Sequence, residues 1–293
     1  NRPIYLPGDR AMIFGGATNA YVFTNVKEGY TFNTTFQITK NWKDGSMMQL
    51  GYNFLDAKDA ASIDAEISSD AYDRNPANIE NSNIPLLAPS LYGNRHRIVG
   101  AGVKRFRYGK FGTTISIFSE YVQGSRFSYT YSGDINNDGS SLNDLIFIPT
   151  DAQIDQMAFS GDAAAQTAQR QGLKSYLAQD EYLNAHRGER SEKYAALSPW
   201  YSRWDVRILE DFYLPNNNTV QLSIDILNIG NLINSDWGVR EFATYTGLAQ
   251  PLAVSVANNV PTYSFDTAQT NTFFQDFGLA SRWQLQLGLR YIF

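Results

Sequence analysis

Five oxygen-bearing side chains in one short segment could together bind a cation. They are Asp134, Asn136, Asp138, Asn143 and Asp144. The first three are spaced two residues apart and are followed by Gly139, which reproduces the first half of a D-x-N-x-D-G calcium loop. Hard oxygen ligands at this spacing converge on one Ca²⁺ when a glycine allows a sharp turn. The chemistry that this segment indicates is calcium binding.

The calcium pattern is incomplete, so two interpretations stay open. An EF-hand loop needs a carboxylate at its position 12, where this chain has Leu145, and no pair of EF-type helices is indicated around the loop. The alternative is an Asx turn combined with an Asp-Gly turn that holds no ion. If calcium binds, its expected role is to stiffen the loop rather than to catalyse a reaction.

Common catalytic motifs are missing from the sequence. The two histidines, His96 and His186, are far apart and do not form an H-E-x-x-H motif. There is no G-x-S-x-G, P-loop or dinucleotide-binding fingerprint. The chain has no cysteine, which excludes disulfide frameworks and cysteine-ligated zinc or iron–sulfur sites. We therefore predict that the protein is not an enzyme.

The elements that would position these residues are strands with two unlike faces. In the segment 282–293, every second residue from Trp283 to Phe293 is apolar, and the residues between them are nearly all polar. Residues two apart in a strand share a face. Aromatic residues at both ends of the apolar side are typical of a strand that crosses a membrane between its two interfaces. At ~3.3 Å per residue and a tilt of ~45°, such a segment spans the ~25 Å apolar band of an outer membrane.

The same alternation recurs along the chain and predicts about eight to ten strands in total. The other predicted strands lie at 30–42, 48–54, 96–107, 110–131, 204–214 and 219–228, with shorter candidates at 20–26, 238–245 and 261–266. Tight turns at 43–45, 108–109 and 215–218 alternate with long excursions at about 56–90, 133–200 and 230–280. Short turns at one end and long loops at the other are typical of outer-membrane β-barrels, in which the turns are periplasmic and the loops external.

Two of the long excursions have content of their own. Residues 54–90 hold seven acids and two bases, and their net charge of −5 equals that of the whole chain. We interpret this excursion as a solvated loop, with attraction of a cationic ligand or partner as the alternative. Residues 152–188 indicate helix, with Leu173 and Leu177 on one face, Asp180 as an N-cap and Gly188 as a stop.

Composition supports a barrel in contact with outer-membrane lipid. The 293 residues carry 24 Lys and Arg against 29 Asp and Glu, a balance that argues against a nucleic-acid partner. Aromatic residues make up 14% of the chain and charged residues 18%, below the ~25% charged that is typical of soluble domains. No stretch approaches the ~20 apolar residues of a spanning helix. We predict an all-β fold, an antiparallel transmembrane β-barrel with long, partly helical outer loops.

Four passages give the chain a resemblance to a known family. They are 133–139 running on to 143–149, 186–188 followed by Pro199-Trp200 and the strand around Asp205 and Arg207, 225–238, and the terminal strand that ends at Phe293. In this order and spacing they resemble the C-terminal part of the barrel of TonB-dependent outer-membrane receptors, and most closely the Oar-like branch. The resemblance covers essentially the whole chain but only the last third to half of such a receptor.

The resemblance implies a larger assembly around this chain. Such receptors have a barrel of 22 strands that an N-terminal plug domain fills, receive energy from the TonB complex, and in some cases work with a surface lipoprotein. The sequence shows no plug, TonB-contacting motif or signal peptide, so we expect residues 1–293 to be the C-terminal part of a barrel domain with its plug upstream. The alternative is a complete barrel of ten or twelve strands.

The resemblance also suggests roles for single residues. Asp205 and Arg207 share a strand face, and with Arg282 and Arg290 they are candidates to line the substrate path or to face the plug. A final aromatic residue after an alternating strand, here Phe293, resembles the signal that the barrel-assembly machinery reads. The alternative for Phe293 is a place in the aromatic belt at the membrane interface.

The leading functional hypothesis is TonB-energised import of a bulky nutrient across a bacterial outer membrane, with this chain supplying barrel wall and outer loops. The rival hypothesis is an outer-membrane barrel whose loops serve adhesion, surface assembly or secretion without active import. A third interpretation is a secreted β-sandwich that binds glycans through its aromatic residues. The sequence does not identify the substrate, because selectivity lies in the loops and the plug.

Overall fold

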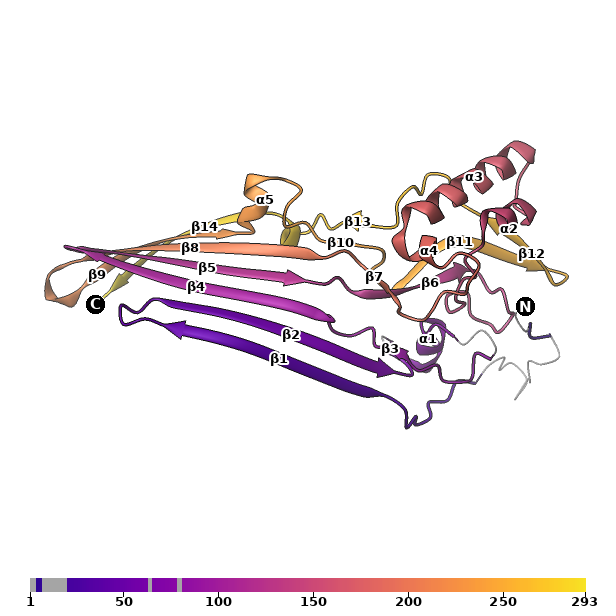
Figure 1. The fold of residues 1–293 in the computed structure, drawn as a ribbon, viewed down its shortest axis with the longest axis horizontal. Helices are drawn as coiled ribbons and strands as arrows, with labels where there is room; N and C mark the ends of the chain where they lie inside the picture. The colour runs from indigo at the N-terminus through magenta and orange to yellow at the C-terminus, as the bar shows by residue number, and fades with distance from the viewer. Residues whose placement is uncertain (1–3, 7–19, 63–64, 78–80) are drawn as a thin grey trace.

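The computed structural model describes residues 4–6, 20–62, 65–77 and 81–293. Its main feature is a long sheet in which seven strands follow one another in the order β1-β2-β4-β5-β8-β9-β14, and every neighbouring pair is antiparallel (Figure 1). The strands are β1 (Tyr30–Asn41), β2 (Met47–Asp59), β4 (His96–Tyr108), β5 (Phe111–Val122), β8 (Tyr201–Tyr213), β9 (Thr219–Leu227) and β14 (Gln284–Ile292). The short β3 (Ala88–Pro89) pairs with the end of β2.

Three tight turns lie at one end of this sheet, which we call the turn end (Figure 1). Gly45 closes the first turn with a φ of 78°, and Gly109 the second with a φ of 59°. The third is a 3-10 turn, η2 (Pro215–Asn217), in which Asn216 and Asn217 both have positive φ. Glycine and asparagine adopt this left-handed conformation at the lowest steric cost, which explains their use here. The long connections lie at the other end, which we call the loop end.

The pairing register gives the sheet one continuous apolar face. Residues directly opposite each other in an antiparallel pair point to the same side. Ile117 of β5 lies opposite Val206 of β8, which lies opposite Ile226 of β9, which in turn lies opposite Leu285 of β14. Further residues on this side include Phe36, Leu50, Ile98, Ile115, Ile224 and Leu287. The other side, the polar face, carries the alternate residues.

The apolar face is not covered by any part of the described chain. Leu287 is 69% exposed and Leu289 is 73% exposed, and most large side chains of this face are exposed in the same way. Among the described residues, β1 and β14 each have only one neighbouring strand, so the sheet is open at both edges. The strand content confirms the mainly β, antiparallel class, and no closed barrel is formed by the described residues.

A second folded unit, the loop-end module, lies beyond the loop end of the sheet (Figure 1). Its four-stranded sheet has the order β12-β11-β6-β7, and helices pack beside it. The strands are β6 (Arg126–Ser132), β7 (Ala196–Leu197), β11 (Leu248–Ala257) and β12 (Val260–Ser264), and the helices are α2 (Asp151–Gln156), α3 (Ala163–Gln179) and α4 (Glu181–Ala185). The strands β6 and β11 are parallel.

The module has a hydrophobic core of its own. Tyr129, Leu173 and Leu177 are among the fully buried side chains of this core. Asp180 links the helices to the sheet, because its carboxylate caps α4 at the Leu183 N–H and accepts the Tyr129 hydroxyl at 2.6 Å. The N-cap predicted at Asp180 is therefore confirmed. The predicted helical stretch is divided among α2, α3 and α4, and Gly188, with a φ of 85°, follows the last of them.

The remaining elements are short. They are α1 (Ser68–Asp73), α5 (Ile229–Ile233), η3 (Leu279–Ser281), and the two-residue strands β10 (Glu241–Phe242) and β13 (Phe274–Gln275), which pair with each other. No helix among the described residues is long and apolar enough to cross a membrane.

Several strand predictions were wrong in extent. The segment 20–26 is not a strand, because no strand among the described residues pairs with it. The predicted strand 110–131 ends at Val122 and resumes as β6 in the module; a Cβ at Gly124 would lie 2.5 Å from the Ser198 carbonyl oxygen, so glycine permits this passage. The segment 238–245 contains only β10, and the candidate at 261–266 is β12.

The excursion 230–280 is more ordered than predicted, because it contributes the hairpin of β11 and β12 to the module. Asn258 and Asn259, both with positive φ, form the turn of this hairpin. Two asparagines in that conformation suit a tight two-residue turn.

Candidate functional site

Two groups of aromatic side chains border the apolar face. At the loop end, Trp200 stacks on Tyr121 with ring centroids 4.7 Å apart and on His96 at 5.9 Å. At the turn end, Phe111 lies 5.9 Å from Tyr108 and 5.5 Å from Phe212. Along β5, Tyr121 and Phe111 are about 33 Å apart at ~3.3 Å per residue. A strand tilt of ~40° reduces this to about 25 Å, the height of the apolar band of an outer-membrane barrel.

Ion pairs run across the loop-end half and the middle of the polar face. Arg97 of β4 binds Glu120 of β5 at 3.0 Å, and the next strand carries the pair of Arg203 and Asp205 at 2.9 Å. Arg207 then pairs with Asp225 of β9. Because residues two apart on a strand share a face, these groups form one charged row on the side opposite the apolar face. Such a row can contact a polar ligand or a second polypeptide.

Two of the predicted path residues belong to this row. Asp205 and Arg207 lie on the same face of β8, but each binds a different partner. The Asp205 carboxylate also accepts the Asn228 backbone N–H at 2.8 Å, at the point where β9 ends. Asn228, with a φ of 52°, then donates from its side chain to the Gly238 carbonyl at 2.9 Å. Asp205 thus fixes the start of the connection that follows β9.

The other two predicted path residues lie apart from this row. Arg290 is exposed on the polar face of β14, opposite Gln221 of β9 and close to the turn end. Arg282 lies outside the strand, directly after η3, because β14 begins only at Gln284. Neither arginine forms an ion pair within the described part of the chain. The structure therefore does not bring all four predicted residues together.

Sequence reasoning missed two arginines at the turn end of the polar face. Arg105 and Arg107 of β4 share the parity of Arg97, and Arg107 lies 4.8 Å over the Tyr213 ring. Neither has a carboxylate within ion-pair distance among residues that the structure describes. The sequence shows that both lie on the same face as Arg97, because they are separated from it by an even number of residues. How close they lie to Arg290 along the sheet depends on the pairing registers of all the strands from β4 to β14. Asp211 lies in the same cross-strand row as Arg107 and Arg290, so the three arginines leave the turn end of this face with an excess of positive charge.

The predicted calcium loop is folded by its own hydrogen bonds. The two carboxylate oxygens of Asp134 accept the backbone N–H groups of Asp138 at 3.1 Å and of Gly139 at 2.9 Å. Asp138 accepts the Ser140 N–H at 2.9 Å and also contacts the Ser82 hydroxyl. Asp144 accepts the Ile135 N–H at 3.2 Å. Of these contacts, only that of Asp138 with the Ser140 N–H two residues on has the spacing of an Asx turn, and the others tie more distant parts of the loop together.

The environment of the Asn143 side chain in this loop is relevant to the calcium interpretation. This side chain is completely buried, and its amide oxygen has no hydrogen-bond partner among the described residues. Its amide nitrogen lies 3.5 Å from the Asp138 carboxylate. However, no group of three or more acidic, histidine or cysteine side chains that could hold a metal is found in the part of the chain that the structure describes. Calcium binding stays a prediction.

Charge and burial around this loop raise the pKa of two groups. Burial raises the pKa of the Asp134 carboxyl. Burial, together with the negative charge of Asp138, raises the pKa of the Tyr72 hydroxyl on α1. The Asn143 carbonyl accepts the Ala77 backbone N–H at 2.9 Å, so the segment that follows α1 is docked on the same loop. The acidic excursion is therefore attached to the segment that contains the predicted calcium loop.

A buried lysine joins the acidic excursion to the module, and sequence reasoning missed it. Lys193 is 2% exposed, and its ammonium donates to the Ala60 carbonyl at 2.7 Å and to the Asn75 side-chain oxygen at 2.6 Å. Burial lowers the pKa of Lys193 to about 8, against an ordinary value of 10.5. Nothing in the local sequence marks this lysine, because its partners lie more than a hundred residues away.

The chain end lies at the turn end of the sheet (Figure 1). Phe293 is 95% exposed, and its ring centroid stacks 6.0 Å from that of Tyr291 on the apolar face. This position suits both of its predicted roles, since the residue is accessible and lies at the level of the turn-end aromatic group.

No family model, curated protein or solved structure matches the chain. The functional argument therefore depends on the geometry described above.

We expect Asp134→Ala to lower the opening free energy of the loop 134–144 by about 1–2 kcal/mol, because two backbone N–H groups lose their acceptor. Hydrogen–deuterium exchange of the purified native protein in EDTA measures this change, with the exposed Asp236→Ala as control. Equal hydrogen exchange of this loop in Asp134→Ala and in the wild-type protein in EDTA would contradict the hydrogen bonds described for Asp134. Calcium that protects the wild-type loop but not Asp134→Ala would identify the predicted ion site.

We expect the docking of the acidic excursion to become more stable as pH rises from about 8 to about 9.5. The folded-state pKa of Lys193 lies below its unfolded value, so the unfolded chain binds more protons in this window and stability rises with pH. The gain should be about 1–2 kcal/mol. Pulse proteolysis in urea can follow it, and Lys193→Met should abolish the slope. An equal slope in both proteins would refute the assignment.

Proposed function

We propose that the long sheet is part of the wall of an outer-membrane β-barrel and that the complete protein imports a bulky nutrient with energy from TonB. The observation that carries the membrane assignment is the continuous apolar face between two aromatic groups. Aromatic side chains prefer the interfaces of a bilayer, and aliphatic side chains prefer its centre. A water-exposed apolar surface of this extent would be unfavourable in a soluble protein.

The two ends of the sheet support the orientation. Outer-membrane barrels have short periplasmic turns and long outer loops, so the turn end would be periplasmic and the loop-end module would lie outside the cell. The exposed edges of β1 and β14 would pair with further strands, since unpaired backbone groups in lipid cost several kcal/mol each. These strands, a plug domain and the TonB-contacting segment would come from the rest of a larger receptor.

The polar face would then border the interior of the barrel. Its row of ion pairs, including Asp205, Arg207 and Asp225, would face the plug or the substrate path, and the arginines near the turn end would form a basic exit. The loop-end module would take part in substrate capture, alone or with a surface lipoprotein. Phe293 would serve as the signal for the barrel-assembly machinery. In this scheme the chain has no catalytic role.

A second function is favoured by one observation. The loop-end module has its own hydrophobic core, as independently stable domains do. A module of this kind on a barrel could serve adhesion, surface assembly or secretion without import. This alternative shares the barrel but needs neither plug nor TonB.

The membrane assignment predicts unequal destabilisation by the same substitution at two adjacent residues of β14. Leu287→Arg places a charge near the centre of the apolar face and should destabilise the protein by about 2–4 kcal/mol in lipid. Gln286→Arg places the same charge on the polar face and should cost far less. Unfolding of the native protein in lipid vesicles with urea measures both changes. Equal destabilisation by the two substitutions would count against the membrane-facing assignment.

The import mechanism is tested on the native protein purified from outer membranes in detergent. We expect an intact mass well above the 32.9 kDa of this sequence and binding to the purified periplasmic domain of TonB. A mass of 32.9 kDa, or a larger protein that does not bind TonB, would overturn the import proposal and favour the surface-interaction role.

A further inference from the structure

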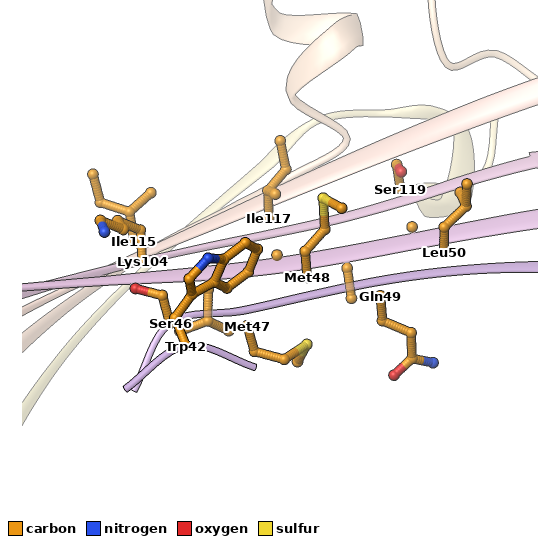
Figure 2. A pocket seen from close by; sticks show the side chains of 14 residues that line it. Trp42, Ser46, Met47, Met48, Gln49, Leu50, Lys104, Ile115, Ile117 and Ser119 are labelled. Atoms are coloured by element: carbon orange, nitrogen blue, oxygen red, sulfur yellow. The ribbon is translucent and has the colours of Figure 1, made fainter. Parts of the chain in front are cut away.

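A groove interrupts the apolar face near the turn end. It has a volume of about 550 Å³, within the ~300–1,000 Å³ range of small-molecule sites, and its lining is mainly apolar. Figure 2 shows Met48, Leu50 and Ile117 on one side of the strands, with Gln49 on the opposite side. The groove therefore opens on the apolar face, the side that would contact lipid.

Two glycines create the floor of this groove. Gly100 and Gly102 of β4 lie opposite Leu50 and Met48 of β2, so the row that faces these large side chains has no side chains of its own. A Cβ at Gly100 would lie 2.6 Å from the Ser119 hydroxyl, and one at Gly102 would lie 3.2 Å from a methyl group of Ile117. The walls are thus side chains of β2 and β5, and the floor is backbone.

The groove has one polar end, where basic side chains gather. Lys104 lies opposite Ile115 and lines the groove at its turn-end limit, whereas Lys40 lies opposite Met48 on the neighbouring strand β1, on the same face but outside the lining. Trp42 lines the same end beside Lys104 (Figure 2). Lys43 adds a further positive charge in the turn. Arg105, whose guanidinium would lie 3.1 Å from a Cβ at Gly45, belongs to the polar face and not to the groove.

Carboxylates offset this charge only in part. Asp44 binds the Lys104 ammonium at 2.8 Å, but both side chains are about half exposed, and exposed pairs of this kind contribute little. The Lys104 ammonium also lies 5.8 Å over the Phe106 ring. Glu210, two strands away on the same face, is held by the Tyr108 hydroxyl at 2.7 Å and the Thr113 hydroxyl at 2.6 Å. The end of the groove remains basic.

We propose that this groove binds an anionic phospholipid of the periplasmic leaflet, with one acyl chain over Gly100 and Gly102 and the phosphate between Lys40 and Lys104. The groove runs from the basic end toward the middle of the strands, which matches the polarity of a lipid with its headgroup at the interface. Lysines near a membrane surface extend their ammonium groups to lipid headgroups and attract anionic lipids. The site rests on the proposed membrane location but not on import.

The test is native mass spectrometry of the full-length protein, purified from outer membranes and exchanged with nanodiscs of phosphatidylglycerol and phosphatidylethanolamine in equal amounts. The wild-type protein should retain phosphatidylglycerol in preference. Lys40→Gln with Lys104→Gln should reduce this retention about tenfold and remove the preference, since each basic residue contributes several-fold to anionic lipid binding. The control, Lys27→Gln with Lys110→Gln, removes the same charge away from the groove and should retain the lipid.

A second pair of variants tests the acyl-chain part of the site. Ser119→Leu should fill the groove beside Gly100 and reduce retention of both lipids. Ser202→Leu adds the same side chain on the apolar face of β8, opposite Tyr121 and outside the groove, and should leave retention unchanged. Equal lipid retention by the groove variants and by their controls would overturn the site. A loss of retention in the lysine variant without any loss in Ser119→Leu would also overturn it.

Failure of this site and failure of the proposed function give different results. A protein that is found in the outer membrane, resists Gln286→Arg and is sensitive to Leu287→Arg, yet retains no phospholipid, would contradict the groove alone. A protein that does not fractionate with the outer membrane would contradict the proposed function before the lipid experiment begins.

Discussion

The pairing register of seven antiparallel strands decides which way each side chain of the long sheet points. A slip of one residue in any pair would turn the apolar side chains of that strand to the polar face. The register instead keeps Ile115, Ile208, Ile224 and Leu287 in one row from β5 to β14. The separation of an apolar face from a charged face follows from this alignment, and the membrane assignment depends on it.

The long connections do not depend on the pairing register of the long sheet, because other interactions hold them together. The loop-end module buries apolar side chains from segments far apart in the chain, and Asp180 joins its helices to its sheet. The acidic excursion is attached by the buried ammonium of Lys193 and by backbone pairing beside Asn143. The sheet thus supplies a regular wall, while the loops supply shaped, charged surfaces at one end of it. This division suits a protein that recognises something outside a membrane.

The sequence predicted the parts of the structure that depend on local pattern. Alternation located β1, β9 and β14, and glycine or asparagine marked the three tight turns. It missed β11, because this strand pairs in parallel with β6, about 120 residues away, and is buried on both faces, so it shows no alternation. Lys193 and the groove between β2 and β5 were also missed, because each depends on which distant segments of the chain become neighbours.

The central claim is that the alternate faces of the sheet meet lipid and the barrel interior. Residues 1–293 contain no cysteine, so single cysteines at Thr114, Ile115, Ser116 and Ile117 of β5 can each carry a fluorescent probe once any cysteine elsewhere in the native protein has been replaced. Collisional quenching by brominated lipids in vesicles then reports contact with acyl chains. The account predicts strong quenching at 115 and 117 and weak quenching at 114 and 116. Quenching without this alternation, or with the opposite parity, would contradict it.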